Sequence, residues 1–282
     1  MLSKRIMRVW LVAVLLAVSA LPGRAAEEGI EWFKDLKQAS TAAQEKNQPM
    51  MIDFWADWCA ACKIMEAEIF SRPEVIAAAR QRIVAVRIHF DLQPELARRY
   101  DILALPFLLF TNSHGTELMH HRGILEAEDL AAVLRALPQD LSEINRLDRI
   151  LQEDKDHFES LRDMGQRLRA EGFFGSSNGF FEKALKQKEA KKDAAQREAI
   201  LFAVGLNSLE MQDGRQAAAS FEKCLKDFPQ SARRAEILLG LGRAYALSED
   251  PEKARKHLRE IIEQHPNSET AETARNLLSQ LP

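Results

Sequence analysis

The 282-residue sequence has few cysteines and no marked excess of either charge. Its three cysteines are too few for a disulfide-dense scaffold, and because three is odd, at least one cannot pair within the chain. The 39 basic and 42 acidic residues give a formal charge of −3, so the chain lacks the basic excess typical of nucleic-acid-binding proteins. Twelve glycines and ten prolines exclude a collagen-like or low-complexity chain. The length instead predicts one or two folded domains.

The first 25 residues have the pattern of a secretory signal peptide. Lys4, Arg5 and Arg8 precede an apolar run over residues 9–20, and the small residues that follow predict cleavage near Ala25. Because the run is short for a membrane span, an uncleaved anchor is the alternative. Without the four basic residues of this segment, 35 basic and 42 acidic residues remain, a charge of −7. We therefore expect a periplasmic protein in a compartment that permits disulfide chemistry.

Residues 27–138 alternate between helical and strand patterns. Helices are expected over residues 30–45, 59–70, 74–81, 94–100 and 126–137, and strands over 50–55, 83–90, 107–111 and 117–121. Helix and strand alternate first, and two strands then meet through a tight turn at Asn112–Gly115. This order predicts an α/β layer fold with a mixed sheet.

Residues 139–282 carry only helical patterns, and they repeat with a period of 37 residues. Gly205 and Gly242 are one period apart, as are Phe221 and Leu258, and a weaker copy surrounds Gly165. The spacing resembles the tetratricopeptide repeat, in which a small residue lies where two helices touch. The resemblance implies about three repeats with a capping helix over 269–281, and a surface that binds a protein or peptide. A spacer or a dimer surface is the alternative.

Cys59 and Cys62 form a Cys-x-x-Cys pair between a buried strand and the start of a helix. Backbone N–H groups at a helix start stabilise a thiolate, so we expect Cys59 to be the nucleophile and the more shielded Cys62 to resolve the mixed disulfide. Half a zinc site is the alternative, but the third cysteine, Cys224, is alone and no histidine pair has matching spacing. We expect no metal, no cofactor beyond the Cys59–Cys62 disulfide, and a buried, unreactive Cys224.

The segment 27–137 resembles a thioredoxin domain. The matching features are the strand ending in Asp-Phe-Trp at 53–55, the motif Trp-Cys-Ala-Ala-Cys-Lys at 58–63, the pair Leu105-Pro106, and Gly123 before the last helix. The resemblance implies a thioredoxin fold, with a central mixed sheet flanked by helices. It also implies that Pro106 is a cis-proline facing the disulfide, that Leu105 offers its backbone to substrate, and that Trp58 lines the substrate surface. An ordinary trans proline is the alternative.

Two acidic residues accompany the cysteines. Asp53 lies in an apolar strand, where an unpaired carboxylate is costly. With Glu66, it falls where the C-terminal periplasmic domain of DsbD, which this segment resembles, has its active-site carboxylates. The resemblance implies that Asp53 moves protons for the buried thiol and that Glu66 adds a second carboxylate. A structural Asp53 paired with Arg87, and a Glu66 on a solvated helix face, are the alternatives.

These features together predict an exported thiol–disulfide oxidoreductase. The Ala-Ala dipeptide contains no histidine that would stabilise the thiolate further, which favours a reductase of protein disulfides. Such a protein needs thiol or disulfide substrates, a separate membrane or periplasmic electron donor, and a partner or client for the repeats; no nucleic acid is expected. The alternative is a holdase resembling the chaperedoxins, in which the repeat surface binds unfolded clients and the redox pair is secondary.

Overall fold

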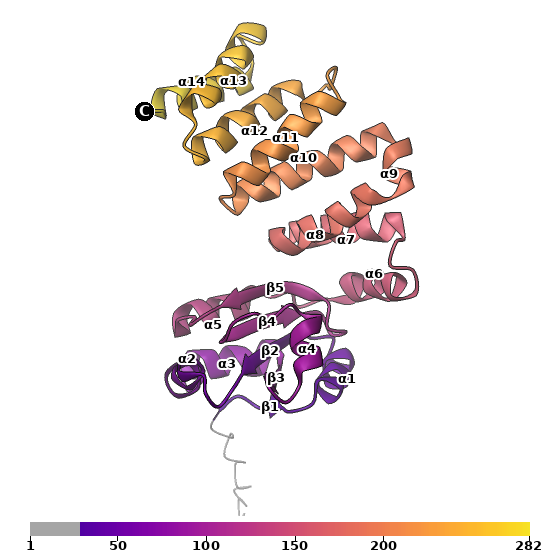
Figure 1. Cartoon of the computed structure of the whole chain (residues 1–282), viewed down its shortest axis with the longest axis vertical. Helices are drawn as coiled ribbons and strands as arrows, with labels where there is room; N and C mark the ends of the chain where they lie inside the picture. The colour runs from indigo at the N-terminus through magenta and orange to yellow at the C-terminus, as the bar shows by residue number, and fades with distance from the viewer. Residues whose placement is uncertain (1–28) are drawn as a thin grey trace, which may run out of the picture.

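The computed structural model describes residues 29–282, in which an α/β unit is followed by a stack of helices (Figure 1). The predicted signal peptide lies outside the described residues. The α/β unit consists, in chain order, of β1 (Trp32–Phe33), α1 (Leu36–Lys46), β2 (Met50–Trp55), α2 (Ala60–Ile64), the π-helix η1 (Met65–Ile69), α3 (Pro73–Arg82), β3 (Val84–His89), α4 (Pro94–Arg99), β4 (Phe107–Thr111), β5 (Glu117–Arg122) and α5 (Ala127–Ala136).

The five strands form one mixed sheet in the order β1-β3-β2-β4-β5. β3 pairs in parallel with β1 and β2, whereas β4 is antiparallel to both β2 and β5. β2 is therefore central and β5 is an edge strand. The predicted mixed-sheet α/β fold is confirmed.

The two faces of the sheet are covered by different helices. Met50, Ile52 and Phe54 of β2 belong to the apolar cluster of the α1 and α4 side. Met51 belongs to the cluster of the α3 and α5 side. Because side chains alternate along a strand, Asp53 shares the second face and points toward the side of α3 and η1.

One local expectation was wrong. The helix expected from residue 30 begins at Leu36, because the Asp35 carboxylate accepts the Gln38 backbone N–H at 2.8 Å and caps the helix there. The preceding Trp32–Phe33 pairs with β3 instead. The segment Lys188–Lys192 forms a short helix whose Ala190 is fully buried.

The C-terminal region is helical throughout, as predicted. Its elements are α6 (Ser142–Glu153), α7 (Phe158–Ala170), α8 (Phe174–Lys186), α9 (Lys188–Lys192), α10 (Ala194–Glu210), α11 (Gly214–Asp227), α12 (Arg234–Leu247), α13 (Pro251–Gln264) and α14 (Glu269–Gln280). Among residues 29–282 the helices are too short or too polar to span a bilayer.

Glycines mark the contacts within the helix pairs. A Cβ added at Gly165 would lie 2.5 Å from the Phe181 ring, and one at Gly205 would lie 2.6 Å from the Phe221 ring. At Gly242 it would lie 2.5 Å from Leu258. The small residue of each repeat therefore lets an apolar side chain of the second helix lie against the backbone of the first.

The α/β unit and the first helices share one apolar core. Leu118 of β5, Leu134 of α5, Ile144 of α6 and Phe181 of α8 belong to a single cluster. At its border the buried Asp148 carboxylate accepts a hydrogen bond from the Thr116 hydroxyl at 2.6 Å. The helices are therefore packed onto the sheet rather than joined to it by a free linker.

Candidate active site

The Cys59–Cys62 pair lies where β2 gives way to α2. The two cysteines are joined in a disulfide, and Cys59 is the N-cap residue of α2. The Cys62 backbone N–H donates to Cys59 Sγ at 3.1 Å. An N–H aimed at the sulfur from a helix start favours the thiolate form once the disulfide is reduced. Both cysteines are buried, with 5% of Cys59 and 2% of Cys62 exposed, so the expected difference in shielding is small.

Apolar and aromatic groups surround the disulfide. Ala56 forms a buried cluster with both cysteines, and Phe90 and Leu105 pack against it. The Trp58 indole N–H donates to Asp91 Oδ2 at 2.8 Å, and its ring meets Phe90 edge-on. This anchoring leaves Trp58 65% exposed beside the buried sulfurs. A substrate reaching the disulfide therefore meets this aromatic surface.

The loop before β4 completes the site. The Leu105–Pro106 peptide bond is cis. The Gly123 N–H donates to the Pro106 carbonyl at 2.9 Å, so the end of β5 holds the proline loop in place. Leu105 lies half-buried against the cysteine cluster.

Asp53 is a buried carboxyl with a raised pKa. Only 1% of the residue is exposed, and the loss of hydration raises its pKa from 3.8 to about 6. Arg87 opposes this shift, because its Nε donates to Asp53 Oδ2 at 3.0 Å, but burial is the larger effect. A carboxyl of this pKa exchanges protons near neutral pH, as the proton carrier expected from the sequence must. The ion pair with Arg87, the alternative from the sequence, is present, and the proton-carrier role of Asp53 stays a prediction.

Arg87 joins the two predicted carboxylates. Its Nη1 donates to Glu66 Oε1 at 2.9 Å, and its guanidinium lies 5.4 and 4.8 Å from the ring centroids of Trp32 and Trp55. The Glu66 side chain is 56% exposed, whereas that of Arg87 is 14% exposed. Glu66 therefore acts on Asp53 through Arg87 and, as a nearby negative charge, adds slightly to the raised pKa.

Of the exposed apolar side chains around the disulfide, the sequence predicted only Trp58. Five of the seven large exposed hydrophobic residues in the described chain come from α2 or from loops at the catalytic end of the sheet; they are Trp58, Ile64, Leu92, Leu103 and Ile124. Leu92 is 76% and Leu103 78% exposed. No sequence motif marks Leu92, Leu103 or Ile124, because only the fold brings the ends of β3, β4 and β5 together.

The third cysteine is remote from this chemistry. Cys224 is fully buried in α11 as a free thiol. Burial, with smaller contributions from Glu198 and Asp227, raises its pKa to about 12. Within residues 29–282 no cluster of metal-ligating side chains forms.

Comparisons with known proteins agree with this geometry. A family model described as a thioredoxin-like domain matches residues 36–138, and a tetratricopeptide-repeat model matches residues 208–281. Residues 36–138 are a thioredoxin-like domain. The predicted thioredoxin fold followed by tetratricopeptide repeats is therefore confirmed.

Relatives of the thioredoxin-like domain carry the name DsbD. The thiol:disulfide interchange protein DsbD of Klebsiella pneumoniae is 38% identical over 98 residues, which are 33% of this chain and 16% of that protein. Its Escherichia coli K12 counterpart is 34% identical over 111 residues, 38% of this chain and 19% of that protein. This chain thus matches less than a fifth of the length of these relatives. The thioredoxin-like domain is related to the DsbD family of thiol–disulfide oxidoreductases.

Solved structures similar to the thioredoxin-like domain include the oxidised C-terminal domain of Neisseria meningitidis DsbD. It is 30% identical, and the match covers 37% of this chain and 97% of that one with a TM-score of 0.33. A thioredoxin from Thermus thermophilus is 24% identical over 38% of this chain and 85% of that one, with a TM-score of 0.35.

Proposed function

We propose that the protein is an exported reductase of protein disulfides, with Cys59 and Cys62 as its redox pair. The observation that carries the proposal is the Cys59–Cys62 disulfide at the start of α2, with the Cys62 N–H bonded to Cys59 Sγ. The disulfide is the redox group, and the chemistry needs no metal or dissociable cofactor. The DsbD relatives are named for thiol–disulfide interchange, which supports the same reaction here.

The reaction starts from the reduced pair. The Cys59 thiolate attacks one sulfur of a substrate disulfide, and the other substrate sulfur leaves as a thiolate. The Cys62 thiol then gives its proton to the Asp53 carboxylate and attacks Cys59 Sγ, which releases the second substrate thiolate. Two electrons pass to the substrate, and the pair ends as the disulfide found here. A separate membrane or periplasmic dithiol donor must reduce it again.

Asp53 and Glu66 have unequal parts in this scheme. Burial places the pKa of Asp53 at about 6, so its carboxylate is available to accept a proton at neutral pH. Glu66 acts indirectly, because its bond to Arg87 holds the guanidinium that also binds Asp53.

Substrate binding falls to the surface around the disulfide. Trp58 supplies an exposed aromatic ring, and Leu105, next to the cis Pro106, supplies backbone groups for an extended substrate. The exposed side chains of Leu92 and Leu103 widen this apolar surface, which suits an unfolded polypeptide better than a small polar disulfide. The helical repeats recruit a protein partner or client.

Replacement of Cys59 by Ser tests the mechanism. The full chain, supplied with dithiothreitol, should reduce insulin, and Cys59→Ser should lose that activity because Ser is no nucleophile toward a disulfide. Wild-type activity in Cys59→Ser would overturn the mechanism. Alkylation trapping in cells tests the direction of electron flow: a mostly reduced pair supports a reductase, and a mostly oxidised pair would make the protein an oxidase.

The exposed Leu92 and Leu103 favour a second candidate, a holdase for unfolded clients. The double variant Cys59→Ala/Cys62→Ala separates the two functions in a client-aggregation assay. Full protection by the double variant would favour the holdase, whereas no protection by either protein leaves the reductase as the function.

A further inference from the structure

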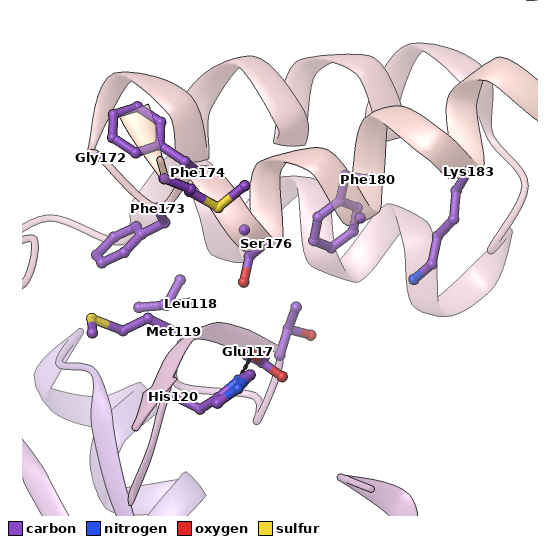
Figure 2. Close-up of a pocket in the computed structure, with 14 residues that line it drawn as sticks. Glu117, Leu118, Met119, His120, Gly172, Phe173, Phe174, Ser176, Phe180 and Lys183 are labelled. Carbon is purple, nitrogen blue, oxygen red and sulfur yellow. Dashed lines mark hydrogen bonds and ion pairs between the residues drawn. The ribbon is translucent and has the colours of Figure 1, made fainter. Parts of the chain in front are cut away.

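A groove of about 650 Å³ lies between β5 and α8, where the thioredoxin-like domain meets the first repeat. Figure 2 shows Glu117 to His120 of β5 on one side and Ser176, Phe180 and Lys183 of α8 on the other. Leu118 and Phe173 belong to the shared apolar core, so the groove opens from that core toward solvent.

One side of the groove is the free edge of the sheet. Within residues 29–282 β5 pairs only with β4, and α8 lies beyond it on the side away from β4 (Figure 1). The Gly123 N–H bonds to Pro106, so the alternation of an antiparallel ladder turns the N–H and C=O groups of His120 and Arg122 away from β4. In the part of the chain that the structure describes, no hydrogen bond joins β5 to α8. These edge groups are available to another backbone.

The opposite side of the groove contains two glycines of α8. A Cβ added at Gly179 would meet nothing within 4 Å, and one at Gly175 only Met211 Sδ at 3.7 Å. This differs from Gly165 and Gly205, where phenylalanine rings occupy the space. Glycine within a helix costs about 0.5–1 kcal/mol relative to alanine, and no packing inside the described chain requires it here. A helix surface without Cβ atoms lets an incoming backbone approach closely.

We propose that the groove binds an extended segment of the protein substrate, which pairs with the free edge of β5 as an added strand. This docking rests on the proposed function, because it makes the substrate a polypeptide. Free edge donors and acceptors that face Gly175 and Gly179 of α8 match an extended chain, whose own backbone supplies both kinds of partner.

The position of the groove relates the docked segment to the substrate's cystine. β5 leads from the groove to Gly123, which bonds to the Pro106 loop beside the disulfide. Three to seven residues separate Gly123 from the groove-lining stretch 116–120, roughly 10–23 Å of extended chain. The docked segment therefore lies within about ten residues of the cystine that Cys59 attacks.

The variant Gly179→Leu places a side chain in the groove, and Gly179→Ala is its matched control. Both add a Cβ to open space and both favour the helix, so neither should unfold it. We expect Gly179→Leu to lower kcat/KM for insulin about tenfold and to leave reduction of glutathione disulfide unchanged. Gly179→Ala, which adds only a Cβ, should lower kcat/KM for insulin by less than Gly179→Leu does and leave reduction of glutathione disulfide unchanged. Equal effects of Leu and Ala, or equal loss with both substrates, would overturn the docking.

A second pair of variants tests the strand edge. His120→Pro removes the outward N–H, whereas His120→Ala removes the same side chain and keeps that N–H. Loss of one hydrogen bond should make His120→Pro about fivefold slower than His120→Ala with insulin, and the two should be equal with glutathione disulfide. Equal rates with insulin would contradict pairing at His120.

Hydrogen–deuterium exchange tests the docking without redox chemistry. Reduced and alkylated insulin B chain has no thiol, and at millimolar concentration it should slow exchange over residues 116–123 in the wild type but not in Gly179→Leu. Unchanged exchange in the wild type would overturn the docking, even if insulin reduction is intact. Activity retained in Cys59→Ser would instead overturn the proposed function. The exchange measurement would then still show whether the groove binds an extended peptide.

Discussion

The active-site end of the thioredoxin-like domain and the contact between α8 and α10 bury polar groups of different kinds. The first buries a carboxyl, Asp53, whose pKa rises to about 6 because water is excluded. The second buries neutral amides and hydroxyls that bind each other: the Asn207 amide donates to Ser177 Oγ at 2.9 Å and to Asn178 Oδ1 at 2.8 Å. A buried ionisable group lowers stability at neutral pH, whereas a neutral network fixes how helices pair.

The cysteines divide in the same way. Cys59 caps a helix and receives a backbone N–H, whereas Cys224 lies inside α11, where burial raises its pKa to about 12. The contrast indicates that the reactive groups lie at one end of the sheet, whereas the buried polar groups of the repeats fix how the helices pack.

The largest effect is expected from Cys62→Ala. Without a resolving thiol the mixed disulfide with Cys59 persists, and turnover of insulin should fall by about a thousandfold or more. Non-reducing electrophoresis should show the trapped complex. Cys224→Ala, the matched control from the repeats, should show neither effect, and a complex trapped equally by that variant would break the comparison.

Phe221→Ala tests whether the packing of the repeats is independent of the redox site. The Phe221 ring fills the space at Gly205 and Gly240 and belongs to a core cluster separate from that of the thioredoxin-like domain. Its removal should destabilise the repeats by about 3–5 kcal/mol, measured by chemical denaturation. Reduction of glutathione disulfide should be unchanged, because the redox site lies in another cluster; a parallel loss of that activity would show that the regions are coupled.

Local patterns were sufficient to predict much of this molecule. β4 matches its expected range Phe107–Thr111, the Cys-x-x-Cys pair lies at a helix start, and the repeat period located the glycine contacts. Apart from the pairing of Asp53 with Arg87, contacts between distant segments could not be predicted from local patterns. The double role of Arg87 depends on β3 lying beside β2, and the groove depends on how α8 packs against β5.

Asp53→Asn should separate activity from stability. Because the fold raises the pKa of Asp53 above 3.8, its stabilising contribution is complete below about pH 4 and is lost as the pH rises through 6. The Asn variant does not titrate, so it should be roughly 1–3 kcal/mol more stable than the wild type at pH 8 and nearly equal at pH 4. Thermal unfolding at the two pH values measures this difference.

The same variant should lose activity. Wild-type turnover should rise with pH through about 6 as Asp53 ionises. Asp53→Asn should lack this rise and be about a hundredfold slower at pH 7. Glu66→Gln is the control: it weakens the bond to Arg87 but keeps Asp53, so the rise should remain. An unchanged pH profile in Asp53→Asn would remove Asp53 from the proton path.

The smallest effect is expected from the thiol of Cys224. Its pKa of about 12 leaves a fraction of only about one in ten thousand ionised at pH 8, and its side chain is fully buried. Iodoacetamide should therefore label Cys224 only after denaturation, and Cys224→Ala should change stability by about 1 kcal/mol or less. Mass spectrometry of the native protein measures the labelling. Rapid labelling of the native protein would mean that α11 opens. It would also place a reactive thiol in the repeats, where the comparison expects only structural groups.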